Sequence, residues 1–177
     1  MNACDSLVRL ACTPSSGQLL SIDDRDILIW AYTVRSAALL NLGRTDNAIA
    51  DLSDAIELDP ISAPLLTNRC RVRAAANYEL DLALADCNAA IDSEPNAAYA
   101  FDSRGLVRLR RGEFTEALSD YDTALHAQPG VATALYGRAI ARARLGQVEA
   151  SQMDAAEAVG NDDQIDDWFA AIGLMLQ

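Results

Sequence analysis

His126 is the chain's one histidine and therefore the first side chain to consider for chemistry. It lies near the C-terminal end of a predicted helix that Gly112 precedes and Pro129 ends. A histidine that works as a catalytic base needs a nucleophile to activate and a third group to orient its ring, and no sequence motif supplies either. A solvated histidine at a helix end accounts for it better. We therefore expect no catalytic residue and no enzymatic activity.

Carboxylates gather near the C-terminus, where they could suggest a calcium site. The cluster consists of Asp162, Asp163, Asp166 and Asp167. A calcium-binding loop alternates its oxygen ligands and has a glycine at its sharp turn, and this stretch has neither feature. Acidic side chains at this place suit the start of a helix. The chain also lacks a phosphate-binding glycine loop and a metal-spaced Cys/His set, so we expect no metal and no cofactor.

The four cysteines allow two interpretations. Cys70 and Cys87 fall on the two helices of one predicted hairpin, where they are either small buried hydrophobic residues or a disulfide. Cys4 and Cys12 would be about 12 Å apart if both were helical, at ~1.5 Å per residue. That is too far for a disulfide unless Cys4 precedes the helix. We predict that Cys70 and Cys87 are buried and that all four cysteines are reduced.

The composition limits the kinds of partner. Of the 177 residues, 51% are hydrophobic, and the formal net charge is −12. A protein this acidic is repelled by phosphate backbones and anionic lipids, so we expect neither nucleic acid nor a membrane as partner. No apolar run is long enough to span a bilayer, and the N-terminus lacks the layout of a signal peptide. The cytoplasm is therefore favoured, with a periplasmic or exported location as the alternative if a signal peptide has been trimmed.

Helical segments recur with a period of 34 or 35 residues. Three of them end at Pro60, Pro95 and Pro129, and the turns before the second helices fall at Gly43, Tyr78, Gly112 and Gly146. Asn77 is expected to take the left-handed conformation that glycine takes in the other turns. Small residues two turns apart let helices approach closely, and the second helices carry them at Ala48, Ala83, Ala117, Ser151 and at Ala55, Ala90, Ala124, Ala158. The first helices match at Tyr32, Thr67, Phe101, Leu135 and at Ser36, Arg71, Gly105, Ala139.

This pattern resembles the tetratricopeptide repeat (TPR) family over roughly Ile29 to Asp163, and the copy from Ala98 to Pro129 matches best. The resemblance implies an all-α fold, a right-handed superhelical solenoid of helix-turn-helix hairpins. Four hairpins are expected within 22–163, at about 29–62, 64–97, 98–131 and 132–163. Residues 1–21 would form a short helix and a loop. Residues 164–177 would form a capping helix, with Phe169 and Gly173 repeating Leu135 and Ala139, because an array must cover its last apolar face.

Charge divides between the two helices of each hairpin. The first helices of the later repeats are rich in arginine, and the second helices are rich in carboxylates. One register holds Asp51, Asp86, Asp120 and Asp154, and another holds Arg35, Arg104 and Arg138. These registers predict a repeated ion pair between neighbouring helices. Because exposed pairs add little stability, its expected role is to fix how the helices stack.

The resemblance also implies a concave groove lined by the first helices. It carries onto that groove Trp30, Leu65, Asn68, Arg69, Tyr99, Asp102, Leu106, Arg110, Tyr136, Ile140 and Arg144. Apolar and aromatic side chains among arginines suit a peptide with hydrophobic anchors and some negative charge, although an ordinary mixed surface is equally compatible. The predicted function is a non-enzymatic protein–protein interaction module or scaffold that binds a peptide or partner protein. The alternative is a structural or assembly protein that self-associates through its terminal helices.

Two narrower resemblances bear on partner and location. Chaperone-binding TPR domains hold a C-terminal carboxylate in a clamp of Lys, Asn and Arg. The matching places here hold Thr33, Ala37, Arg69, Tyr99 and Ser103, or Asn68, Val72, Ser103, Thr133 and Gly137. Neither set makes that clamp, so a chaperone tail is not the expected partner. The stretch "ACTPSSGQL" looks like the segment that opens some exported bacterial TPR proteins, which keeps an oxidising compartment as the alternative.

Overall fold

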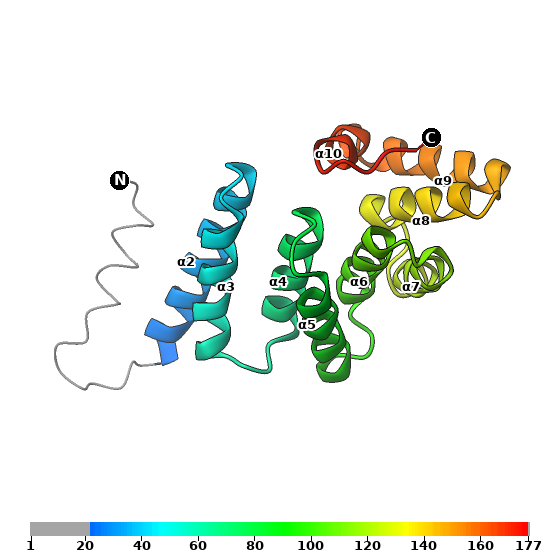
Figure 1. Cartoon of the computed structure of the whole chain (residues 1–177). Helices are drawn as coiled ribbons and strands as arrows, with labels where there is room; N and C mark the ends of the chain where they lie inside the picture. Colours follow the sequence, from blue (N-terminus) through cyan, green and yellow to red (C-terminus); the bar gives the residue numbers. More distant parts are fainter. Residues whose placement is uncertain (1–21, 177) are drawn as a thin grey trace, which may run out of the picture.

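The computed structural model describes residues 22–176, which form nine helices and no strand (Figure 1). In chain order these are α2 (Ile22–Asn41), α3 (Thr45–Leu58), α4 (Ala63–Ala75), α5 (Leu80–Ser93), α6 (Ala98–Arg111), α7 (Phe114–Ala127), α8 (Ala132–Arg144), α9 (Val148–Asn161) and α10 (Ile165–Ala171). The predicted short helix and loop in 1–21, with Cys4 and Cys12, lie outside the described residues.

The helices pack as consecutive hairpins, α2 with α3, α4 with α5, α6 with α7 and α8 with α9. Each second helix also packs on the first helix of the next hairpin. Among the first helices, α4 contacts α6 and α6 contacts α8, whereas the second helices make no comparable contact with one another in the described part of the chain. The first helices therefore lie on the inner, concave side. The predicted all-α solenoid of helical hairpins is confirmed (Figure 1).

Small residues sit where the helices approach most closely, as predicted. The alanines of both second-helix registers are completely buried: Ala48, Ala83, Ala117, Ala55, Ala90, Ala124 and Ala158. In the third hairpin the ring of Tyr121 lies against two glycines. A Cβ atom built on Gly105 would be 2.8 Å from this ring, and one built on Gly137 would be 2.3 Å from it. Only glycine fits at either place without displacing Tyr121.

The α4–α5 hairpin has one more residue between its ion-paired side chains than the other hairpins, and its turn, residues 76–79, is the longest of the four. Asn77 is left-handed there with φ 52°, as predicted, and Glu79 is left-handed with φ 46°. The ion-pair spacing shows the insertion directly. Arg104 and Asp120 are 16 residues apart along the chain, whereas Arg69 and its partner Asp86 are 17 apart.

This longer turn shifts the register of α4 by one residue from the prediction. The equivalent of Gly105 in α4 is Cys70, not Arg71, because Cys70 directly follows the ion-paired Arg69 just as Gly105 follows Arg104. Likewise Leu66, not Thr67, corresponds to Phe101. The corrected register determines which side chains of α4 face the concave side.

Cys70 and Cys87 form a disulfide, which corrects the prediction that all four cysteines are reduced. Both are completely buried, as predicted. Their Cα atoms are 5.6 Å apart, within the range that a disulfide requires. They are this close because they occupy the places that Gly105 and Tyr121 occupy in the next hairpin, where the two helices come nearest.

The chain ends in α10 and an irregular tail, residues 172–176. Ile165 and Phe169 of α10 are buried, and the Phe169 ring stacks on that of Tyr136 of α8 with centroids 4.7 Å apart. Phe169 thus covers the last hairpin as predicted. Gly173 does not repeat the role of Gly105, since it lies after the helix with φ 75° and has no neighbour where its Cβ would be.

None of the helices in residues 22–176 combines the length with the apolar character that crossing a bilayer requires.

Candidate functional site: the concave groove

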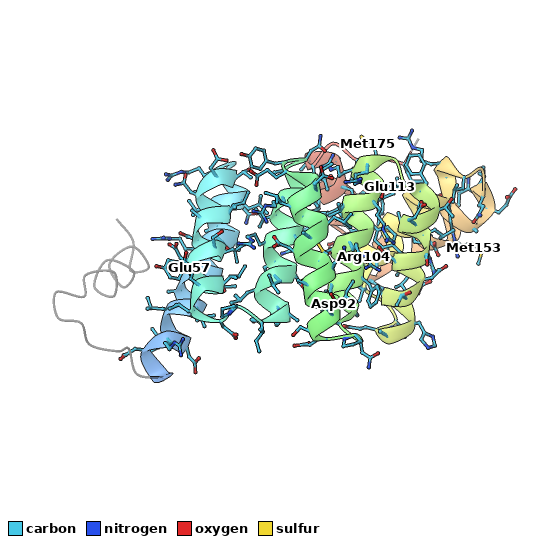
Figure 2. The ribbon with its side chains drawn as sticks, turned by 60° about the horizontal axis from the view of Figure 1, so that its bottom comes forward. Glu57, Asp92, Arg104, Glu113, Met153 and Met175 are labelled. Carbon is cyan, nitrogen blue, oxygen red and sulfur yellow. A yellow bond between two sulfur atoms is a disulfide. The ribbon has the colours of Figure 1, made fainter. Side chains whose placement is uncertain are left out.

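Ion pairs connect the two helices of every hairpin, as predicted, with Arg69–Asp86 as a fourth member. The pairs are Arg35–Asp51, Arg69–Asp86, Arg104–Asp120 and Arg138–Asp154. All four aspartates are buried, so these pairs are less exposed than the sequence suggested. Other second-helix carboxylates, among them Glu57 and Asp92, lie at the surface (Figure 2). The outer side is therefore acidic. The four pairs, called the ion-pair ladder below, leave each of their arginines bound to an aspartate.

Two hollows open on the concave side of the N-terminal half. The first, called the α2–α4 hollow, has a volume of about 310 Å³ and is lined by Thr33, Ser36, Ala37, Leu40, Asn41, Asn68, Arg71, Val72, Ala75 and Trp168. The second, the α4–α6 hollow, has a volume of about 260 Å³ and is lined by Ala63, Pro64, Thr67, Asn68, Glu94, Ala97, Tyr99 and Ala100. Asn68 lines both, so the hollows adjoin along α4.

The predicted groove residues separate into exposed and buried groups. Trp30 is 59% exposed and Tyr99 is 56% exposed. Arg144 is exposed and Asn68 is partly exposed. The remaining apolar candidates are buried, with exposures of 8% or less: Leu65, Leu106, Tyr136 and Ile140.

Two causes explain the buried apolar candidates. Leu65 belongs to a core cluster with Leu28 and Tyr32 of α2, because the register shift turns it away from the concave side. Leu106, Tyr136 and Ile140 belong to a cluster that includes Phe169, with Ile172 and other tail residues packed against it. The C-terminal segment thus occupies the concave surface in the last two repeats, which the sequence pattern did not indicate.

Arg69 and Arg110 are likewise not available to a partner. The Arg69 guanidinium donates to both Asp86 oxygens, at 2.9 and 2.7 Å. Arg110 donates to the carbonyl oxygens of Ala74, Ala75 and Ile172, at 3.0, 2.8 and 2.5 Å. Burial among these groups lowers the pKa of Arg110 below its ordinary value. Arg110 is therefore a structural tie between α4, α6 and the tail.

Arg71 is an arginine on the concave side that the sequence pattern did not indicate. It is exposed and lines the α2–α4 hollow. It also lines a third hollow, the α8–α10 hollow, with Thr133, Asp162, Gln164, Ile165, Asp167 and Trp168. The signal in the sequence was the extra residue between Arg69 and Asp86. It assigns Arg69 to the repeated ion pair and leaves Arg71, two residues later, outside that pairing.

Asp102 of α6 is buried and close enough to Arg71 for the two charges to interact. Its carboxylate accepts a hydrogen bond of 2.7 Å from the Thr133 hydroxyl. Burial raises the pKa of Asp102 from 3.8 to about 6, while the Thr133 hydrogen bond and the charge of Arg71 act in the opposite direction. Asp102 is thus buried and not accessible on the concave surface.

The remaining candidates for chemistry show only structural contacts. His126 lies in a wide, shallow hollow on the outer side of α7 with Thr115, Ser119 and Asp122, and the Asp122 carboxylate is occupied by Arg138. Asp162 accepts a hydrogen bond from the backbone N–H of Gln164 in the turn before α10. Within residues 22–176 no three His, Cys, Asp or Glu side chains form a group that could hold a metal ion.

Comparison with known proteins gives two family matches. Models of the tetratricopeptide repeat match residues 103–164 and residues 31–62. No curated protein sequence is significantly similar to the chain.

Solved structures share the fold at low sequence identity. A thermophilic TPR protein from Thermus thermophilus is 17% identical with a TM-score of 0.70, over 82% of this chain and 83% of that chain. The MamA protein is 20% identical with a TM-score of 0.63, over 98% and 88%. The second TPR domain of human RPAP3, solved in complex with an HSP70 peptide, is 24% identical with a TM-score of 0.58, over 67% and 98%. These likenesses concern the fold alone.

Proposed function

Because the chain belongs to the tetratricopeptide repeat family, whose fold generally serves protein interaction and not catalysis, we propose that it is a non-enzymatic interaction module. It binds a peptide segment of a partner protein in the open, N-terminal part of the concave groove. The observation that carries this proposal is the pair of adjoining hollows along α4. Exposed Tyr99 lines one of them, and exposed Trp30 precedes by three residues Thr33, which lines the other. A similar TPR domain holds a peptide in its solved structure.

The anchors of the proposed interface are fewer than the sequence pattern suggests. Trp30 and Tyr99 remain accessible, whereas Tyr136 is covered by Phe169. Exposed aromatic side chains are frequent anchors at protein interfaces, because they bury a large area while losing little conformational freedom. The groove therefore binds a short segment along α2, α4 and α6.

The test is selection of peptides from a random-sequence library on the immobilised protein, followed by affinity measurement for the best binder. Tyr99→Ala and Trp30→Ala are each expected to weaken binding by about 1–3 kcal/mol, as truncation of a central anchor does. Met153→Ala is the matched control, since Met153 is a large apolar side chain, 73% exposed, on α9, a helix that contributes no residue to either hollow (Figure 2). Loss of binding in Met153→Ala, with Trp30→Ala and Tyr99→Ala unaffected, would place the interface elsewhere.

A second candidate function is self-association through a terminal helix. Ile27, Trp30 and Val34 of α2 are all exposed, and they recur at helical spacing. The last helix offers less, because its Ile165 and Phe169 are buried. Light scattering that gives a dimer mass for the wild-type protein and a monomer mass for Trp30→Asp would favour this function.

We also propose that the protein folds in an oxidising compartment, in place of the cytoplasm. The buried Cys70–Cys87 disulfide supports this location, because structural disulfides persist mainly outside the reducing cytoplasm. Intact-mass measurement of protein taken from its native source without reductant tests the proposal. Fully reduced cysteines would contradict this proposal and favour the cytoplasm.

A further inference from the structure

Arg71 stands out because its guanidinium has no hydrogen bond or ion pair while it faces a hollow. In residues 22–176, the guanidinium groups without either contact are those of Arg44, Arg71 and Arg144. Arg44 precedes α3 and Arg144 ends α8, both at hairpin turns. Arg71 alone of these three lines the α2–α4 hollow. The buried Asp102 acts on it only through its charge, which leaves the guanidinium N–H groups available to a ligand.

The α2–α4 hollow is also free of acidic side chains. Arg71 is its one charged lining residue, although the whole chain carries a net charge of −12. Beside Arg71, the side chains of Asn41 and Asn68 also line the hollow. Neither side-chain amide makes a hydrogen bond with another described residue. Amide N–H groups and a guanidinium are donors that a carboxylate can accept from.

The other side of Arg71 has the opposite character. Asp162 and Asp167 line the α8–α10 hollow, so the carboxylate of a ligand would be repelled there. A ligand carboxylate therefore lies on the α2 side of Arg71. The Trp168 side chain, which lines both hollows, offers an apolar surface next to the charge.

Resting on the function proposed above, we infer that the α2–α4 hollow binds an Asp or Glu side chain inside a partner peptide, with an apolar residue of that peptide against Trp168. One arginine without an ion pair matches a single carboxylate. A C-terminal acidic residue would bring two carboxylates. Arg71 also lies between two open hollows, which leaves room for the peptide to continue on both sides of the charge.

The test uses the full chain and defined probes. Two libraries of acetylated, amidated nonapeptides share a fixed leucine and differ only in a central Glu or Gln, and a third has central Gln and a free C-terminal carboxylate. The wild-type protein is expected to retain the Glu library preferentially. Arg71→Gln should weaken the best Glu peptide about tenfold, the loss of one charge-assisted hydrogen bond, and leave Gln peptides unchanged. Arg44→Gln, an exposed arginine without an ion pair that lies in the turn before α3 and outside the predicted groove, should change neither.

Each other outcome overturns the inference. Equal retention of the Glu and Gln libraries, or an unchanged Glu preference in Arg71→Gln, removes the carboxylate site. Preference for the free C-terminus removes the internal acidic residue. If retention still falls in Trp30→Ala and Tyr99→Ala without any Glu preference, the groove binds peptides and only the carboxylate site is wrong. If the wild-type protein retains none of the libraries, the proposed function fails as well.

Discussion

Tyr121 shows how single residues set the spacing of the helices. Its ring is completely buried between Gly105 of its own hairpin and Gly137 of the next. A side chain at either glycine therefore pushes on two hairpins at once. Because protein interiors are close-packed, a small added volume there is felt as strain.

Gly105→Ala tests this arrangement. The added Cβ would be 2.8 Å from the Tyr121 ring, so the free energy of unfolding should fall by about 1–3 kcal/mol through overpacking. Chemical denaturation gives the value. Gly160→Ala is the control, because Gly160 lies in α9 with open space at its Cβ, and the better helix propensity of alanine should stabilise it slightly. Equal effects at the two sites would contradict the predicted strain.

Asp102 gives a pH dependence of stability. Its pKa is about 6 in the folded protein, against an ordinary value of 3.8. Between these values the folded state binds more protons than the unfolded state, so this group lowers stability as pH rises. Asp102→Asn should therefore gain stability relative to wild type between about pH 4 and pH 6, approaching about 2–3 kcal/mol above that window.

Urea denaturation across this pH range measures the difference. Thr133→Val should steepen the wild-type dependence, because it removes the hydrogen bond that favours the charged carboxylate. Parallel pH profiles for wild type and Asp102→Asn would show that Asp102 does not titrate in this range.

At the scale of elements, the sequence was informative wherever a contact repeats within one hairpin. The alanine registers of the second helices and three ion pairs follow from identical spacing in successive copies. The pattern failed at α4, since one inserted turn residue moves Arg69 into the ladder and Arg71 into the groove. The 35 residues from Pro60 to Pro95, against 34 from Pro95 to Pro129, signal the extra residue but not its place within the hairpin.

Contacts between distant elements were the other limit. Arg110 bonds to Ile172, 62 residues away, and Tyr136 is covered by Phe169. The first contact depends on the path of the tail after Ala171, which has no repeat from which to predict it. For the second, the sequence placed Phe169 at the end of the array but left Tyr136 in the open groove. The disulfide could be proposed but not chosen, because two cysteines on facing helices suit burial as well as bonding.

The disulfide should stabilise the α4–α5 hairpin beyond what core cysteines provide. It closes a loop with a sequence separation of 17, for which loss of unfolded-state freedom predicts about 3 kcal/mol. Cys70→Ala/Cys87→Ala should therefore be less stable than the oxidised protein in chemical denaturation. Wild type reduced under mild denaturation should lose a similar amount, and an unchanged midpoint on reduction would contradict this role.

At the scale of the whole molecule, the two ends of the solenoid differ in what they offer a partner. At the C-terminal end α10 and the tail occupy the concave side against α8. At the N-terminal end the α2–α4 hollow stays open, and its wall is completed by Trp168 of α10. The tail thus shortens the groove and shapes the part that remains.

Arg110 is the group that holds this arrangement together, because its guanidinium joins the end of α4 to Ile172 of the tail. Arg110→Ala should lower the free energy of unfolding by about 2–4 kcal/mol, since it removes charge-assisted hydrogen bonds and leaves carbonyl groups without donors. Amide exchange at Gly173 and Leu174, whose N–H groups bond to Ala170 and Phe169, should accelerate more than exchange in α2.

The effect of Arg110→Ala should persist at high salt, because its partners are backbone carbonyls in a half-buried place and not exposed charges. Arg144→Ala is the matched control: Arg144 is exposed and has no partner in the described residues, so stability should stay within about 0.5 kcal/mol of wild type. If salt abolishes the Arg110→Ala effect, or if the tail exchanges as slowly as before, then Arg110 acts through surface charge and the tail is held by Phe169 alone.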